Sequence, residues 1–126
     1  QRGTTMIGYT TVGANDLEKA KTFFDAVLAP LGAKRSFGMD RMQFYGTPGG
    51  GALAVCEPYD KQAATPGNGA MVALACPSPE VVDQVHAAAL AAGGTCEGEP
   101  GKRMPTFYGA YFRDLDGNKF CAFKMG

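Results

Sequence analysis

The feature that most constrains the fold is an internal repeat. A shift of 62 residues, which carries Ile7 onto Gly69, lays IGYTTVGANDLEKAKTFFDAVLAPLG onto GAMVALACPSPEVVDQVHAAALAAGG. Few residues are identical, but an apolar segment, a helix start, an amphipathic helix and a glycine follow in the same order in both copies. Such a repeat predicts one supersecondary unit that is built twice, with the two copies packed together.

Each copy carries the signals of one helix. Asp16 and Ser78 stand at the N-cap position, where a side-chain oxygen accepts a hydrogen bond from a free helix N–H. The first helix has apolar residues at spacings of three and four, and the second has a thinner stripe of the same period. Gly32 and Gly94 then predict where the two helices end.

Short strand-like segments, separated by turn residues, flank each helix. The expected strands are 6–13, 33–37, 41–46 and 51–56 in the first copy, and 69–76, 95–98, 107–113 and 119–125 in the second. Each copy therefore has the order βαβββ. The predicted fold class is α+β, with two tandem βαβββ units forming a curved mixed sheet around a cleft and the helices on the outer face.

The length of 126 residues predicts one domain, here residues 6–126. Unit one covers about 6–56, a polar linker covers 57–68, and unit two covers about 69–125. Residues 1–5 show no apolar periodicity, and we expect them to be an expression remnant that precedes the domain.

Composition excludes several classes of partner. Twelve basic residues balance twelve acidic ones, so no strong field favours nucleic acid or an anionic membrane. The longest purely apolar run, MVALAC, is too short to cross a bilayer. The four cysteines form no CxxC pair and lie in or beside apolar segments, which favours reduced structural thiols and a cytoplasmic location.

The segments NDLEKAKTFFDAVLAPLG, PSPEVVDQVHAAALAAGG and FRDLDGNKF, in this order, resemble the vicinal oxygen chelate superfamily. This superfamily contains glyoxalase I, extradiol dioxygenases and bleomycin-resistance proteins. The resemblance extends from about Met6 to Lys124 and is nearest to small bacterial glyoxalase-like members. It implies a paired βαβββ fold whose cleft, in the enzymes, holds a divalent ion through His, Gln or Glu side chains and uses it as a Lewis acid.

Carried over position by position, the four metal-ligand positions of that superfamily fall on Tyr9, Ala54, Met71 and Cys121. Ala54 has no donor atom, and the Met71 thioether is a poor ligand for hard or borderline ions. A phenol gives up its proton reluctantly, which makes Tyr9 a poor ligand, and the single thiolate of Cys121 does not complete a set of three or four ligands. We therefore expect no metal or other cofactor, with a divalent metal ion as the alternative.

The segment GKRMPTFYGAYFRD, residues 101–114, concentrates basic and aromatic side chains. Strand alternation places Phe107 and Tyr111 on one face and Tyr108 on the other, and the sequence leaves open which face lines the cleft. Related proteins carry a similar segment near the cleft mouth. The predicted ligand-binding cleft therefore consists of Tyr9, Ala54, Met71, Arg103, Phe107, Tyr108, Tyr111 and Cys121.

The only histidine, His86, falls on the second helix in register with Phe24 of the first. Because the cleft is expected to be lined by strands, we interpret His86 as a partly exposed helix residue and not as a general base.

The preferred hypothesis is a metal-free, glyoxalase-like protein that binds a small organic ligand in an apolar, aromatic cleft. If it is an enzyme, the alternative is a metal-dependent lyase of the glyoxalase I type or an extradiol dioxygenase with a variant site, and Tyr9 and Cys121 are the candidate catalytic residues. A structural or partner-binding module is the third possibility. The sequence leaves open whether the chain forms a homodimer.

Overall fold

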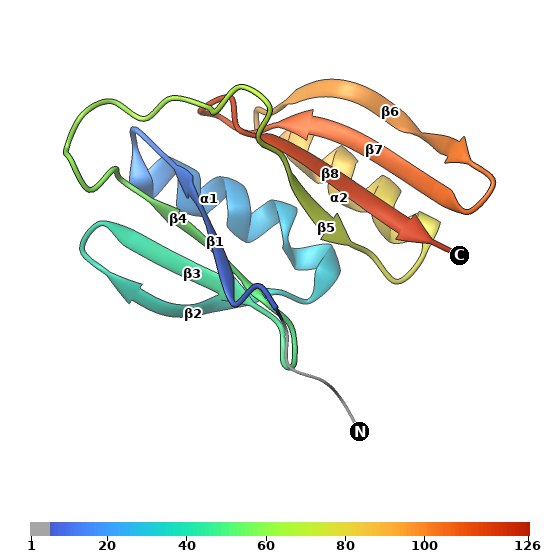
Figure 1. The fold of residues 1–126 in the computed structure, drawn as a ribbon, viewed down its shortest axis with the longest axis horizontal. Helices are drawn as coiled ribbons and strands as arrows, with labels where there is room; N and C mark the ends of the chain where they lie inside the picture. The colour runs from blue at the N-terminus through green and yellow to red at the C-terminus, as the bar shows by residue number, and fades with distance from the viewer. Residues whose placement is uncertain (1–5) are drawn as a thin grey trace.

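A computed structural model describes residues 6–126, and the expected expression remnant at 1–5 lies outside the described residues. The first unit contains β1 (Tyr9–Gly13), α1 (Leu17–Val27), a short 3-10 helix (Ala29–Leu31), β2 (Lys34–Met39), β3 (Met42–Gly46) and β4 (Ala52–Cys56). The second contains β5 (Val72–Ala75), α2 (Pro79–Ala91), β6 (Thr95–Met104), β7 (Phe107–Arg113) and β8 (Lys119–Met125). The predicted pair of βαβββ units is confirmed (Figure 1).

The two units have the same strand topology. The strand orders are β1-β4-β3-β2 and β5-β8-β7-β6, so the first strand of each unit lies at a sheet edge. β1 runs parallel to β4 and β5 runs parallel to β8, whereas the remaining pairs are antiparallel. Within residues 6–126 no backbone ladder joins β1 to β5, so the mixed sheet is divided into two four-stranded sheets.

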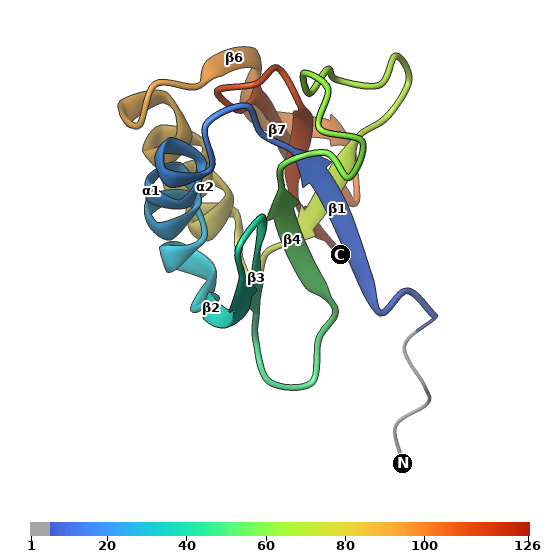
Figure 2. The same cartoon turned by 90° about the vertical axis from the view of Figure 1, so that its left-hand side faces the viewer.

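Both helices cover the same side of the molecule, and Figure 2 shows them as one layer beside the strands. Their N-terminal caps are the predicted ones, because Asp16 Oδ1 accepts from Lys19 N at 3.1 Å and Ser78 Oγ accepts from Val81 N at 3.3 Å. Neither helix is long and apolar enough to cross a bilayer, nor is any other helix in the described part of the chain.

The two helix ends differ from each other. α1 ends at Val27, before the predicted stop at Gly32. Gly32 is instead the cap of the 3-10 helix that follows, and it has the left-handed conformation expected at a C-terminal glycine, with φ of 74°. In the second unit Gly93 takes this role, with φ of 104°, so the prediction of Gly94 was wrong by one residue. Gly94 is needed for a different reason: a Cβ there would lie 2.7 Å from the Arg113 carbonyl oxygen and 2.9 Å from that of Ala89.

One hydrophobic core lies between the helix layer and the sheets and crosses from unit one to unit two. Phe24 of α1 contacts Phe23 at 5.0 Å and Phe120 of β8 at 5.4 Å between ring centroids. Phe112 stacks on Phe120 at 5.5 Å. These four rings are 0–1% exposed, so side chains of both units stabilise the same core.

Two turns and the linker tie the units together at one end. Asn118 Nδ2 donates to the Gly13 carbonyl at 2.9 Å, and Asn15 Oδ1 accepts from Ala64 N at 2.7 Å. The turn in DLDGNK is built around Asp114, whose carboxylate accepts from the backbone N–H groups of Asp116 and Asn118. Burial raises the pKa of Asp114, and these donors oppose that shift.

Strand lengths differ from the prediction in places. β1 begins at Tyr9 and β5 at Val72, later than the apolar segments suggested. β6 extends from Thr95 to Met104, far beyond the expected 95–98, and its register to β7 shifts at several points. It lies at the edge of its sheet, where the missing N–H of Pro100 is tolerated.

Candidate functional site

Each sheet has an open face, by which we mean the face turned away from the helices. Strand alternation and register define it. On the first sheet the open face carries Tyr9 of β1, Phe37 of β2, Phe44 of β3 and Ala54 of β4. On the second it carries Phe107, Tyr111 and Arg113 of β7 and Lys119, Cys121 and Phe123 of β8.

The first open face holds a row of aromatic rings. Phe44 lies at its centre, with the Tyr9 ring 5.1 Å away and the Phe37 ring 5.9 Å away between centroids. Tyr9 and Phe37 are each 58% exposed, which is high for aromatic side chains. Ala54 pairs with Phe44 in the ladder but is fully buried, so it offers a ligand no accessible surface. Exposed aromatic surface of this kind is a candidate binding surface.

The second open face is aromatic and cationic. The Tyr111 ring lies 5.4 Å from the Arg103 guanidinium and 5.6 Å from the Lys119 ammonium. Arg103 is fixed by its own donors, which reach the backbone oxygens of Glu99 at 2.6 Å and Gly101 at 3.0 Å. Cys121 is the ladder partner of Tyr111, and burial raises the pKa of both side chains. At neutral pH both are therefore protonated, and the charge of this face comes from its cations.

The sequence left open which face of β7 is turned towards the helices, and two contacts answer this question. Phe107 stacks on Phe123 at 5.5 Å on the open face. Tyr108 points the other way, and its hydroxyl donates to Asp83 Oδ1 of α2 at 2.7 Å. The prediction that Tyr108 lines the cleft was therefore wrong, because its phenol is used in a contact between strand and helix.

The predicted cleft residues do not all meet in one pocket. Met71 lies with Arg113 and Lys119 in a pocket of about 560 Å³ formed by the loop that precedes β5. A separate pocket of about 380 Å³ lies in the joint between the units and is lined mainly by apolar residues, among them Leu28, Leu53 and Val72. Sequence reasoning missed this second pocket, because its walls come from segments that are distant in the chain.

The residues at the superfamily's metal-ligand positions do not fit a divalent ion of the usual kind. Tyr9 and Ala54 belong to the first sheet, Met71 to the loop that precedes β5, and Cys121 to the second sheet. The four offer one phenol, one thioether and one thiol. Within residues 6–126 the structure brings three His, Cys, Asp or Glu donors together in one place only. That group is His86, Cys96 and Glu99, which lies on the helix side of the second sheet.

The burial of His86 contradicts a second prediction. It is only 3% exposed, whereas a partly exposed helix residue was expected. The signal was present in the sequence, because His86 follows Val82 by four residues and therefore lies on the same buried stripe as Val82 and Ala89.

Comparison with known proteins identifies the family. The model of the Glyoxalase/Bleomycin resistance protein/Dioxygenase superfamily matches residues 6–122. The chain belongs to this superfamily. A glyoxalase/bleomycin resistance protein from Albidiferax ferrireducens T118 is 41% identical, with a TM-score of 0.90 over 97% of this chain and 100% of that one. A comparison with curated proteins gives no significant match.

Other solved structures share the fold at lower identity. A hypothetical protein from S. aureus is 28% identical, with a TM-score of 0.74 over 97% of this chain and 95% of that one. TnmS3, an antibiotic binding protein from Streptomyces sp. CB03234, is 20% identical, with a TM-score of 0.68 over the whole of both chains. The resemblance to the glyoxalase-like proteins inferred from sequence segments is confirmed.

Proposed function

We propose that this glyoxalase-like protein binds a planar aromatic anion on its second open face, without the help of a metal ion. The observation that carries the proposal is the Tyr111 ring, which has the Arg103 guanidinium 5.4 Å and the Lys119 ammonium 5.6 Å from its centroid. The aromatic rings of this face offer apolar surface for stacking, and the two cations over Tyr111 attract a carboxylate or phenolate on the same ligand.

Preorganisation supports this proposal. The guanidinium of Arg103 is held by two backbone oxygens, so little side-chain freedom is lost when a ligand binds. Arg113 is less free to bind an anion, because it pairs with Glu97 at 3.2 Å and donates to the Gly117 carbonyl at 2.8 Å. Arg103 and Lys119 are therefore the proposed anion contacts, and Tyr111, Phe107 and Cys121 form the apolar floor beside them.

Metal-free binding agrees with the residues at the superfamily's ligand positions. Ala54 has no donor and is buried, and the pKa of Cys121 is raised, which disfavours the thiolate that would bind a metal. TnmS3, which has the same fold, is an antibiotic binding protein, so small-molecule binding occurs on this architecture. The expectations of no cofactor and a cytoplasmic location remain predictions.

Calorimetric titration with 2-naphthoate, compared with 2-naphthylmethylamine, tests the proposal. The anion should bind and the amine, which has the same ring system, should not. Lys119→Gln and Tyr111→Leu should each weaken naphthoate binding by about tenfold, the size of one cation or stacking contact in a partly desolvated site.

Arg41→Gln is the matched control, because Arg41 lies over the Tyr59 ring at 5.2 Å in the same geometry elsewhere. It should leave binding unchanged, as should prior treatment with EDTA. Equal binding of anion and amine, or no effect of Lys119→Gln, would overturn the proposal. So would binding that requires a divalent ion or metal-dependent turnover of a glutathione hemithioacetal or a catechol.

We also propose a homodimer that covers the first open face. The exposure of Tyr9 and Phe37 supports this, since a monomer would leave an aromatic row in water. Light scattering should give twice the mass of the chain, and Phe37→Glu should give the monomer. A wild-type monomer at high concentration would refute this part without affecting the ligand proposal.

A further inference from the structure

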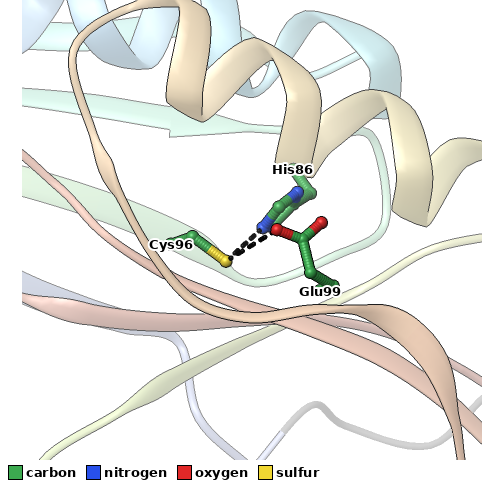
Figure 3. A group of neighbouring side chains, drawn as sticks. All are labelled: His86, Cys96 and Glu99. Atoms are coloured by element: carbon green, nitrogen blue, oxygen red, sulfur yellow. Dashed lines mark hydrogen bonds between the residues drawn. The ribbon is translucent and has the colours of Figure 1, made fainter.

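Three side chains of different donor type meet on the helix side of the second sheet (Figure 3). His86 Nε2 lies 3.3 Å from Cys96 Sγ, and Cys96 Sγ lies 3.4 Å from Glu99 Oε2. All three donor atoms lie within 4.8 Å of one another. His86 is buried, Cys96 is half-buried and Glu99 is exposed, so the group reaches from the core to the solvent.

The local fold explains why these residues meet. α2 turns its buried stripe towards the sheet, and His86 lies on that stripe. In a regular strand Cys96 and Glu99 would point to opposite faces, because they are three residues apart. In β6 the register shifts between Cys96 and Gly98, and again between Gly98 and Gly101.

These shifts act as β-bulges and turn both side chains to the helix side. Cys96 pairs with Phe112, whose ring lies in the core, so this part of β6 faces α2. Gly98 pairs with Tyr111 of the open face, and a Cβ there would lie 3.0 Å from the Tyr111 ring. Glu99, next in the chain, points back towards His86.

We propose that His86, Cys96 and Glu99 form a three-ligand site for Zn²⁺, with water in the fourth position. An imidazole nitrogen, a thiolate and a carboxylate oxygen are the donors that zinc takes in proteins. Tetrahedral zinc with its usual bond lengths places a nitrogen and a sulfur ligand about 3.5 Å apart, close to the separation seen here. Only small movements are needed to admit the ion.

The site is separate from the ligand site proposed above. The second sheet lies between them, since Cys96 faces α2 whereas Tyr111 faces away from it. It also involves none of the superfamily's ligand positions, Tyr9, Ala54, Met71 and Cys121. Bound zinc would tie α2 to β6, the edge strand of its sheet, and so stabilise this side of unit two.

The test begins with full-length protein freed of metal by a chelator and then dialysed. Zn²⁺ is titrated in competition with a chromophoric chelator, and Co²⁺ is titrated as a spectroscopic probe. We expect one equivalent of zinc, a rise in Tm, and a thiolate-to-cobalt charge-transfer band in the near ultraviolet. A dissociation constant for Zn²⁺ weaker than about 10 µM would overturn the proposal, because such binding is typical of adventitious surface groups.

Variants identify the ligands. Cys96→Ser should abolish the charge-transfer band, and Glu99→Gln should weaken Zn²⁺ binding by at least about tenfold, since even loss of an outer partner commonly costs that much. Cys56→Ser and Glu97→Gln are matched controls: Cys56 is also a half-buried free thiol, and Glu97 lies on the same strand but pairs with Arg113.

The substitutions are made at Cys96 and Glu99 and not at His86, because Cys96 and Glu99 are not fully buried. Circular dichroism would confirm that the variants are folded. A band that survives in Cys96→Ser, or is lost in Cys56→Ser, would refute the assignment. Naphthoate binding should be unchanged by zinc, so failure of the zinc site would leave the proposed ligand site intact.

Discussion

The two units share a topology but differ in chemistry where the helix meets the sheet. Unit one places Phe24 there, in contact with three other core rings. The repeat places His86 at the equivalent position of unit two, in contact with the thiol of Cys96. The two units therefore share their shape and the burial of this position, whereas the chemical type of the buried side chain differs.

Each unit also has a hydrogen bond from a strand tyrosine to a helix aspartate, and these two contacts differ in burial. Tyr45 of β3 donates to Asp25 of α1 at 3.0 Å, and Tyr108 of β7 donates to Asp83 of α2 at 2.7 Å. Tyr45 is 1% exposed, and its carboxylate partner is also bound by Arg35 through two donors at 2.8 and 2.9 Å. The pair in unit two is an exposed contact, so the same two residue types should contribute differently to stability.

The largest effect is expected from Phe24. Phe24→Ala should lower the free energy of unfolding by about 3–5 kcal/mol, because it removes a buried ring that contacts both units and leaves a cavity. Urea denaturation followed by circular dichroism measures this. Tyr59→Ala, the truncation of a ring that is 85% exposed, should cost less than about 1 kcal/mol. Equal losses would show that Phe24 is not a centre of the core.

The tyrosine–aspartate comparison should give a smaller effect. Tyr45→Phe should cost about 1 kcal/mol, because a buried hydrogen bond is lost and Asp25 keeps only Arg35. Tyr108→Phe should be close to neutral, since water replaces its exposed contact. The difference in urea midpoint between the two variants checks this, and a larger loss for Tyr108→Phe would contradict the assigned burial.

The smallest effect concerns pH. Hydrogen bonds from Arg35 lower the pKa of Asp25 below its ordinary value of 3.8. Burial opposes this shift, and the hydrogen bond from Tyr45 adds to it. A carboxyl with a lowered folded pKa stabilises the fold above its unfolded pKa, and this contribution is lost as the pH falls through the folded pKa. It should stay below about 1 kcal/mol, because both partners of the ion pair are half exposed.

The measurement is the difference in unfolding free energy between wild type and Asp25→Asn as a function of pH. The difference should be constant near neutral pH and shrink as the pH falls below 3.8. Arg35→Gln should remove most of this dependence, since Arg35 is its main cause. A difference that grows on acidification would show the opposite sign of shift.

The sequence was sufficient for the fold because local and long-range signals agreed. Asp16 and Ser78 mark the helix starts and cap them in the structure, and the repeat implied a second unit once the first was recognised. The same agreement explains why the superfamily could be identified from short segments.

The candidate sites were harder to predict because they depend on irregular backbone. Gly98, Pro100 and Gly101 looked like the end of a strand, yet β6 continues through them with shifted register. No periodicity rule places Cys96 and Glu99 on one face. Similarly, alternation separated Tyr108 from Tyr111, but only the contact with Asp83 shows which of them faces the helix.

The division into two sheets has a consequence for how the chain unfolds. No hydrogen-bond ladder of the described strands links β1 to β5, so side chains such as Phe24 and Phe120 carry much of the coupling between the halves. Either half on its own would expose one of these rings to water. The two repeats should therefore melt in a single cooperative transition, as one thermodynamic unit formed by packing and not by backbone pairing.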